Sequence, residues 1–365
     1  MQHERMLYSV NVQMTASQLR SALQTVKRFS RSAPAAKAVH PALTQGYSTL
    51  PSLKPRSKDN LDHVSRPEGL DQLHAEGIDG RGVTVAVIDS GVARHEDFGD
   101  RIKAFKDFGS KRRAPFDPRG HGTHVAGIIL GDGEKIDGIA PKADLVSCRV
   151  ASPNEAVEAL DWVIANREKY SIDVVNLSLG APANPDPEKD ELRKAAERAV
   201  AAGLIVVASA GNECTGDSCQ ATITSPGNSP DVITVGALDD HGTSKRADDN
   251  IWKMSSQGAK GSGKPDLVAE GVNVVSVLAP KSDYAERAGH DAHYVSASGS
   301  SQATSMVTGA VTLLMQANPS LSNAEVKEIL LKTADPVKGA SKASQGAGRL
   351  DLREAIEVAQ AKRSA

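Results

Sequence analysis

From about residue 67 onward, the chain alternates short apolar runs with longer amphipathic segments. The apolar runs are continuous and rich in β-branched residues, whereas a half-exposed strand would alternate apolar with polar positions. Continuous runs of this kind are typical of strands buried on both faces of a sheet. The runs expected to form strands are residues 83–88, 145–150, 174–179, 204–208, 232–235 and 272–277.

Helical segments separate these runs. Ser152 is a suitable N-cap, with a proline at the first helical position and a glutamate at the third. Residues 190–202 show helical spacing and stop at Gly203, and Ser322 opens a second capping box. Strands that alternate with helices predict an α/β fold with a mostly parallel central sheet flanked by helices.

Residues 1–66 differ from the rest of the chain. They contain ten Lys and Arg against three Asp and Glu, and residues 30–58 are rich in Ser, Pro, Ala and Lys with little periodicity. Such composition is typical of a linker or a disordered segment. The chain therefore divides into a basic N-terminal extension, residues 1–66, and one large domain, residues 67–365.

Composition excludes several classes of function. The 365 residues carry a net charge of −2, which does not favour nucleic acid or an anionic membrane as a partner. No apolar run approaches the roughly 18 residues that span a bilayer. The first 30 residues lack the apolar stretch of a secretory signal, so a cytoplasmic location is slightly favoured, with secretion as the alternative. Three cysteines are too few for a disulfide framework.

Three segments each place a residue of catalytic type beside glycine: residues 85–91 (VAVIDSG), 120–127 (GHGTHVAG) and 298–304 (SGSSQAT). Asp89 ends an apolar run, while His121 and Ser301 each open a helix-like stretch. Asp, His and Ser are the components of an activated serine nucleophile, and this chain order is that of subtilisin. The sequence resembles the subtilisin-like serine peptidases, or subtilases, over about residues 67–361.

The resemblance implies a subtilisin-like fold and a serine endopeptidase that acts through an acyl-enzyme. Carried over motif by motif, Ser301 is the nucleophile, His121 the general base and Asp89 the carboxylate that orients it. Asn212 matches the asparagine of the oxyanion hole. His124 is a second, structural histidine, and its spacing from His121 does not fit the helical metal pair of zinc proteases.

Ser305 competes with Ser301 for the role of nucleophile, because residues 303–306 also contain a Thr-Ser-Met tripeptide like that of the family. The spacing to Gly309 favours Ser301, which would also lie at the N-terminus of a helix. Ser300, Gln302 and Ser305 stand where the family usually has Thr, Met and Pro. These departures are the one argument for an alternative function, a catalytically inactive subtilase fold that serves as a binding module.

The same alignment implies a pocket for the residue before the cleaved bond. Its walls are two segments: Ser178, Leu179 and Gly180, and Ser209, Ala210 and Gly211. Backbone and small side chains there would leave an apolar slot, so a large apolar residue should be preferred; Glu213 at the rim would also admit a basic one. A family turn that often contains a cis proline matches residues 225–227.

The remaining expectations concern cofactors and partners. Catalysis should require no cofactor and no metal ligands are assigned; structural calcium is possible but has no recognisable site, because the loop at 131–137 is shorter than the family's calcium loop. A solvated loop is the interpretation for Asp239, Asp240, Asp248 and Asp249, with cation binding as the alternative. Cys214 and Cys219 could close a small disulfide, with Cys148 a buried thiol. The expected partners are protein or peptide substrates, and a monomer is expected. In subtilases an N-terminal segment often assists folding, and residues 1–66 could be such a pro-segment.

Overall fold

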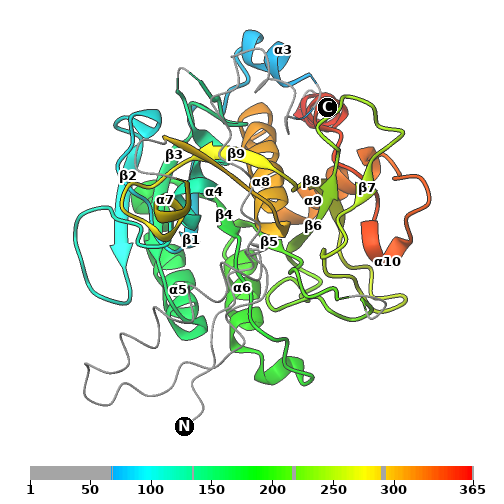
Figure 1. Cartoon of the computed structure of the whole chain (residues 1–365), viewed down its shortest axis with the longest axis horizontal. Coiled ribbons are helices and arrows are strands. Elements are labelled where there is room, and N and C mark those ends of the chain that lie inside the picture. The colour runs from blue at the N-terminus through cyan, green and yellow to red at the C-terminus, as the bar shows by residue number, and fades with distance from the viewer. Residues whose placement is uncertain (1–66, 68, 134, 216–218, 289–292, 364–365) are drawn as a thin grey trace. The chain divides into compact units, whose positions relative to one another are not determined.

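The computed structural model describes residue 67 and residues 69–363, except for 134, 216–218 and 289–292 (Figure 1). The N-terminal extension predicted for residues 1–66 lies outside the described residues.

A mostly parallel sheet forms the centre of the described domain. Within the described residues it has eight strands in the order β2-β3-β1-β4-β5-β6-β7, with β8 also paired to β6. Neighbouring strands run parallel except β7, which is antiparallel to β6. The strands are β1 (Thr84–Asp89), β2 (Ile102–Asp107), β3 (Asp144–Arg149), β4 (Ile172–Leu177), β5 (Ile205–Ser209), β6 (Ile233–Asp239), β7 (Asn250–Ile251) and β8 (Leu267–Glu270). The predicted α/β class and mostly parallel sheet are confirmed.

One apolar run does not belong to this sheet. Residues 272–277 contain β9 (Val274–Val277), which pairs antiparallel with β10 (Tyr294–Ala297) in a separate two-stranded sheet. An apolar run predicts burial, and Val274 and Val277 are buried, but it does not specify the pairing partner. Three strands of the central sheet, β2, β7 and β8, were not predicted. Strand β2 contains polar residues and has only β3 as a neighbour, so it lacks a continuous apolar signal.

The side chains of β1 show how the two faces of the sheet are covered. Val85 and Val87 belong to a core shared with α4 (His121–Leu130), α8 (Ser300–Ala317) and α11 (Leu352–Arg363). The alternate residues Ala86 and Ile88 belong to a second core shared with α5 (Pro153–Tyr170) and α6 (Glu191–Ala201). This alternation follows from the two-residue period of a strand. In Figure 1, α5 and α6 lie together below α8.

The smaller elements complete the described domain: α3 (Leu70–Ala75), η2 (Glu96–Phe98), η3 (Pro187–Lys189), α7 (Asp283–Ala288), α9 (Asn323–Thr333) and α10 (Lys342–Gln345).

The predicted helix ends are confirmed. The Ser152 hydroxyl accepts a hydrogen bond from the Glu155 N–H, and Ser322 and Glu325 form a complete capping box. Helix α6 ends at Ala201, two residues before Gly203, whose φ of 86° is the left-handed conformation typical of a residue after a helix.

Parallel strands end at a common edge of their sheet, and this edge assembles the polar residues singled out by sequence. Asp89 is the last residue of β1, residues 178–180 follow β4, and residues 209–211 begin with the last residue of β5. In open α/β sheets, ligands bind outside the carboxyl ends of the strands. The candidate site is therefore expected at this edge.

Candidate active site

A buried Asp–His pair lies at the end of β1. His121 Nδ1 is 2.8 Å from Asp89 Oδ1, and the two residues are 1% and 0% exposed. Burial disfavours the imidazolium, but the charge and hydrogen bond of Asp89 outweigh it, so that the pKa of His121 is raised. The pair therefore holds a histidine of raised basicity, with Nδ1 committed to the carboxylate.

A second buried carboxylate, Asp117, fixes the start of α4 and was missed in the sequence. Its oxygens accept hydrogen bonds from the N–H groups of Gly120 and Thr123 and from the Thr123 hydroxyl. It also accepts from the Ser90 hydroxyl, which in turn accepts from the Gly122 N–H. Asp117 thus ties the first turn of α4 to the residue after Asp89. The sequence could have identified Asp117 by its position shortly before a helix, because the unpaired N–H groups in the first turn of a helix need acceptors.

Two glycines allow His121 to approach Asp89. Gly120 has a φ of 85°, a conformation that L-residues rarely adopt. A Cβ atom on Gly122 would lie 2.2 Å from the Gly91 carbonyl oxygen and 3.1 Å from Asp89. The GHG sequence is therefore required by the close packing of α4 against the end of β1.

His124 is buried one turn further along α4. Its Nε2 atom lies 3.2 Å from the Val274 carbonyl oxygen and 3.1 Å from that of Val295, so that it joins α4 to β9 and β10. Burial, followed by the neighbouring charge of His121, lowers the pKa of His124 to about 3. His124 is therefore neutral near pH 7, as suits a structural role.

Ser301 lies in the first turn of α8. Its hydroxyl donates to the Ser178 carbonyl oxygen at 3.1 Å, and the Ser178 hydroxyl donates to the Ser301 carbonyl oxygen at 3.0 Å. Ser305 lies one turn further into the helix, where its hydroxyl donates to the same Ser301 carbonyl oxygen at 2.8 Å. The two serines therefore occupy different environments, one at a helix terminus and one bonded back to the helix backbone.

Asn212 is connected to the start of α8 through Ser300. The Ser300 N–H donates to Asn212 Oδ1 at 2.9 Å, and the Gly211 N–H donates to the Ser300 hydroxyl at 3.2 Å. Because Oδ1 is the acceptor, the amide nitrogen is directed away from the Ser300 N–H. Ser300 stands where the family usually has Thr, and nothing in the sequence indicated that it holds Asn212 in position.

Comparison with known proteins agrees with this geometry. The model of the subtilase family matches residues 80–348. The chain is 36% identical over 303 residues to the serine protease AprX of Bacillus subtilis, covering 78% of this chain and 68% of that protein. It is 34% identical over 269 residues to subtilisin Savinase of Lederbergia lenta, covering 72% and 86% respectively.

The chain belongs to the subtilase family.

It is a subtilisin-like serine endopeptidase, and its fold has a solved counterpart. Fervidolysin of Fervidobacterium pennivorans, described as a keratinolytic enzyme related to subtilisin, matches with a TM-score of 0.65 and 25% identity. The match covers 82% of this chain but only 45% of the fervidolysin chain. Among the residues that the structure describes, no helix has the length and apolar character needed to cross a membrane.

The two segments expected to wall a substrate pocket of this subtilase lie side by side. The Ser209 hydroxyl donates to the Leu179 carbonyl oxygen at 3.2 Å, which links the end of β5 to the segment after β4. A Cβ atom on Gly180 would lie 2.5 Å from the Thr224 hydroxyl oxygen. The Ser225–Pro226 peptide bond is cis, as the family turn suggested. Small residues therefore keep the backbones of these segments close together.

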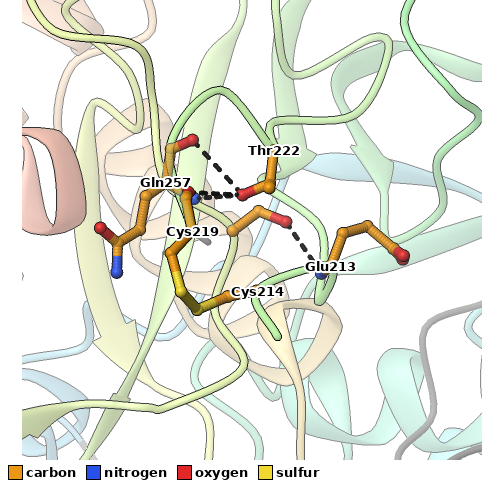
Figure 2. The surroundings of a disulfide bond; sticks show 6 residues. Glu213, Cys214, Cys219, Thr222 and Gln257 are labelled. Atoms are coloured by element: carbon orange, nitrogen blue, oxygen red, sulfur yellow. Dashed lines mark hydrogen bonds between the residues drawn. A yellow bond between two sulfur atoms is a disulfide. The ribbon is translucent and has the colours of Figure 1, made fainter. Parts of the chain in front are cut away.

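Glu213 and a disulfide bond follow Asn212 directly. Cys214 and Cys219 are bonded to each other, and Cys148 is a buried free thiol whose pKa is raised by burial. Figure 2 shows the disulfide beside Thr222, whose hydroxyl donates to the Cys219 carbonyl oxygen and accepts from the Gln257 N–H. Burial raises the pKa of Glu213, whose N–H donates to the Ser256 hydroxyl. The expected Cys214–Cys219 pairing is present.

Asp132, in the short loop at residues 131–137, and the nearby Asp97 make polar contacts within the protein. Asp132 Oδ2 lies 2.5 Å from Lys142 Nζ, and the Asp132 N–H donates to the Asp97 carbonyl oxygen at 3.0 Å. The buried Asp97 carboxylate accepts a hydrogen bond from the Tyr294 hydroxyl. A calcium ion prefers six to eight oxygen ligands. The Asp132 and Asp97 carboxylates contact Lys142 and Tyr294, and the expectation that this loop lacks the family's calcium site stays a prediction.

Proposed function

We propose that this endopeptidase cleaves peptide bonds with Ser301 as nucleophile, His121 as general base, Asp89 as orienting carboxylate and Asn212 as oxyanion donor. Ser301 Oγ attacks the carbonyl carbon of the substrate while its proton passes to His121 Nε2. The proton then passes to the departing amine, and water hydrolyses the acyl-enzyme by the same route.

The observation that carries this proposal is the buried contact of 2.8 Å between His121 Nδ1 and Asp89 Oδ1. A carboxylate at Nδ1 fixes the tautomer and stabilises the imidazolium that forms when the base takes up a proton. Proton transfer must then use Nε2. The pair supports acid–base chemistry, because a histidine without this partner would be held neutral by its burial.

The position of Ser301 supports its choice over Ser305. Ser301 lies in the first turn of α8, where the helix dipole favours developing negative charge. The Ser305 hydroxyl is bonded to the backbone of the preceding turn. In this proposal, Asn212 Nδ2 and the Ser301 N–H stabilise the tetrahedral oxyanion, while Asn212 Oδ1 keeps its bond to the Ser300 N–H.

The substrates are proteins or peptides, and a large apolar residue before the cleaved bond is preferred. Residues 178–180 and 209–211 form the walls of the pocket in this proposal, and all of them except Leu179 have small side chains or none, which leaves room for such a residue. Glu213 would admit a basic residue at the rim, so Glu213→Gln should lower kcat/KM for arginine substrates more than for phenylalanine substrates. No cofactor takes part in the reaction as proposed.

A fluorophosphonate probe, which reacts with activated serines, tests the proposal. The wild-type chain and Ser305→Ala should be labelled, while Ser301→Ala should not be labelled although its circular dichroism is unchanged. Ser305→Ala is the matched control, because it also removes a serine hydroxyl, one helical turn away from Ser301. A folded wild-type chain that takes up no probe would instead indicate the inactive binding module. Labelling lost only in Ser305→Ala would assign the nucleophile to Ser305.

A further inference from the structure

We propose that His95, Glu96 and His293 form a binding site for one divalent transition-metal ion of the zinc class, separate from the catalytic residues. Among the described residues, these three each offer a ligand atom, and the three atoms lie within 4.8 Å of one another. The residues come from two segments about 200 positions apart: His95 and Glu96 from the start of η2, and His293 from the residue before β10.

The base of the site is a buried hydrogen-bonded group. His95 Nδ1 lies 3.2 Å from Asp97 Oδ1, with the His95 and Asp97 side chains 8% and 0% exposed. The Tyr294 hydroxyl donates to the same carboxylate at 3.1 Å. Histidines that bind metals usually donate their second ring N–H to a carboxylate, which fixes the ring and raises its basicity. Here His95 Nδ1 accepts a hydrogen bond from the Asp97 backbone N–H at 3.2 Å, so Nε2 is the ring atom that would bind the ion, and binding there would place the ring proton on Nδ1, 3.2 Å from the Asp97 carboxylate.

The other two ligands form an accessible rim on a fixed backbone. The side chains of His293 and Glu96 are 64% and 75% exposed, and His293 Nδ1 lies 3.9 Å from Glu96 Oε1. The His293 carbonyl oxygen accepts from the Leu278 N–H at 2.9 Å, and the Glu96 carbonyl oxygen accepts from the Gly99 N–H at 3.0 Å. An ion can therefore enter from solvent, and small side-chain rotations suffice to close the ligand set.

The two segments are already held in register next to the ligands. Tyr294, which bonds Asp97, is the immediate neighbour of His293, and Asp97 is the immediate neighbour of Glu96. The rings of His95 and Tyr294 also pack edge to face, with centroids 5.9 Å apart. A cation at the rim would thus extend an existing contact between the η2 segment and β10.

The donor set selects the class of ion. Two imidazoles and one carboxylate suit Zn²⁺, which binds three protein ligands and keeps a fourth position for water, and they also suit Co²⁺ and Ni²⁺. Calcium and magnesium prefer oxygen ligands. The bound ion would cross-link the chain after β1 to the strand that leads to α8, and it should stabilise the folded protein because the unfolded chain lacks the site.

Isothermal titration of the full-length Ser301→Ala protein with Zn²⁺ tests the site, since this background removes self-cleavage. His293→Ala and Glu96→Gln, both at exposed side chains, should each lose one binding event relative to the parent. Tyr294→Phe should keep the event but weaken it about tenfold, because the carboxylate that supports His95 loses a hydrogen bond. Ca²⁺ should give no corresponding event, and Co²⁺ should give the visible absorption of a four-coordinate site.

His241→Ala is the matched control, because His241 is another exposed histidine beside an aspartate, Asp239. This variant and the parent should bind the same number of zinc ions, since the other histidines are retained. Thermal unfolding adds a second readout: Zn²⁺ should raise the midpoint of the parent and of His241→Ala more than that of His293→Ala. Equal zinc stoichiometry and affinity in the parent and in folded His293→Ala would overturn the proposal.

Discussion

The side-chain oxygen of Asn212 accepts a hydrogen bond of 2.9 Å from the backbone N–H of Ser300, the residue before the proposed nucleophile. Asn212 follows β5 by three positions, whereas Ser300 begins α8. This contact fixes which end of the amide is committed to the protein. In the proposed mechanism, Nδ2 is the donor to the oxyanion that forms on a substrate held at Ser301.

Two substitutions at Asn212 separate these two roles. Asn212→Asp keeps an acceptor for the Ser300 N–H but removes the donor, whereas Asn212→Ala removes both. Both variants should lose about 10²–10³-fold in kcat, a magnitude carried over from the equivalent asparagine of a subtilisin, with little change in KM. The free energy of unfolding measured in urea should fall more in Asn212→Ala than in Asn212→Asp. Steady-state kinetics with wild-type kcat in Asn212→Asp would exclude the amide as an oxyanion donor.

The raised pKa of His121 predicts the pH dependence of the reaction. The neutral imidazole is the base, so kcat/KM should fall as the pH falls through the pKa of His121. Burial opposes the charged form, but Asp89 outweighs it, and the rising limb should therefore lie above the ordinary histidine value of 6.5.

Asp89→Asn checks this cause. It removes the charge that raises the pKa while burial remains, so the limb should move to lower pH, and kcat should fall by about 10⁴-fold because the tautomer is no longer fixed. His124, with its pKa of about 3, should not contribute to the profile. A profile that is flat from pH 5 to 9 in a folded enzyme would argue against a histidine base.

Sequence patterns predicted the parts of this fold that depend on local rules. The buried strands and the caps at Ser152 and Ser322 follow from runs of apolar residues and from short-range side-chain contacts. Strand β2 was missed because its exposed positions break the apolar run, and the pairing of β9 with β10 depends on partners distant in the chain. A local sequence pattern can therefore predict that a strand or helix forms, whereas the strand with which it pairs is decided by tertiary packing.

Some residues of the candidate site could likewise be predicted from the sequence, and others could not. Asp89, His121, Asn212 and Ser301 stand in recognisable motifs, and each lies at or beside the end of a strand or the start of a helix. Asp117 stands in no such motif, and its importance comes from a cluster of N–H groups that exists only in the folded chain. The contact between His95 and His293 is likewise invisible in the sequence, because about 200 residues separate them.

The cysteines predict a definite pattern of thiol reactivity. Cys214 and Cys219 are bonded, and Cys148 is buried with a raised pKa. The native oxidised protein should therefore react slowly with a thiol reagent, since burial excludes the reagent and disfavours the thiolate. Denaturation without reductant should expose one thiol, and denaturation with reductant should expose three. Three thiols without reductant would show that the disulfide does not form.

The last prediction concerns how many substrate residues before the cleaved bond the enzyme recognises. In subtilases a loop after the strand equivalent to β3 pairs with the substrate backbone. Here β3 ends at Arg149, and Ser152 already caps α5. The intervening N–H groups are used within the protein: Val150 donates to the Asp89 carbonyl oxygen at 2.8 Å, and Ala151 donates to Glu155 at 2.7 Å. This connection therefore offers little edge for an extended peptide.

Main-chain pairing supplies affinity in this mode of recognition, and the flanking pockets supply specificity. Selectivity should therefore be concentrated in the residue next to the cleaved bond and weak for the two to four residues before it. In a series of peptides lengthened from two to five residues on that side, kcat/KM should rise only modestly, because little remote binding energy is available to the transition state. The same series lengthened after the cleaved bond provides the comparison. A steep rise with length, or sharp selectivity at the fourth residue, would show that another segment replaces the missing edge.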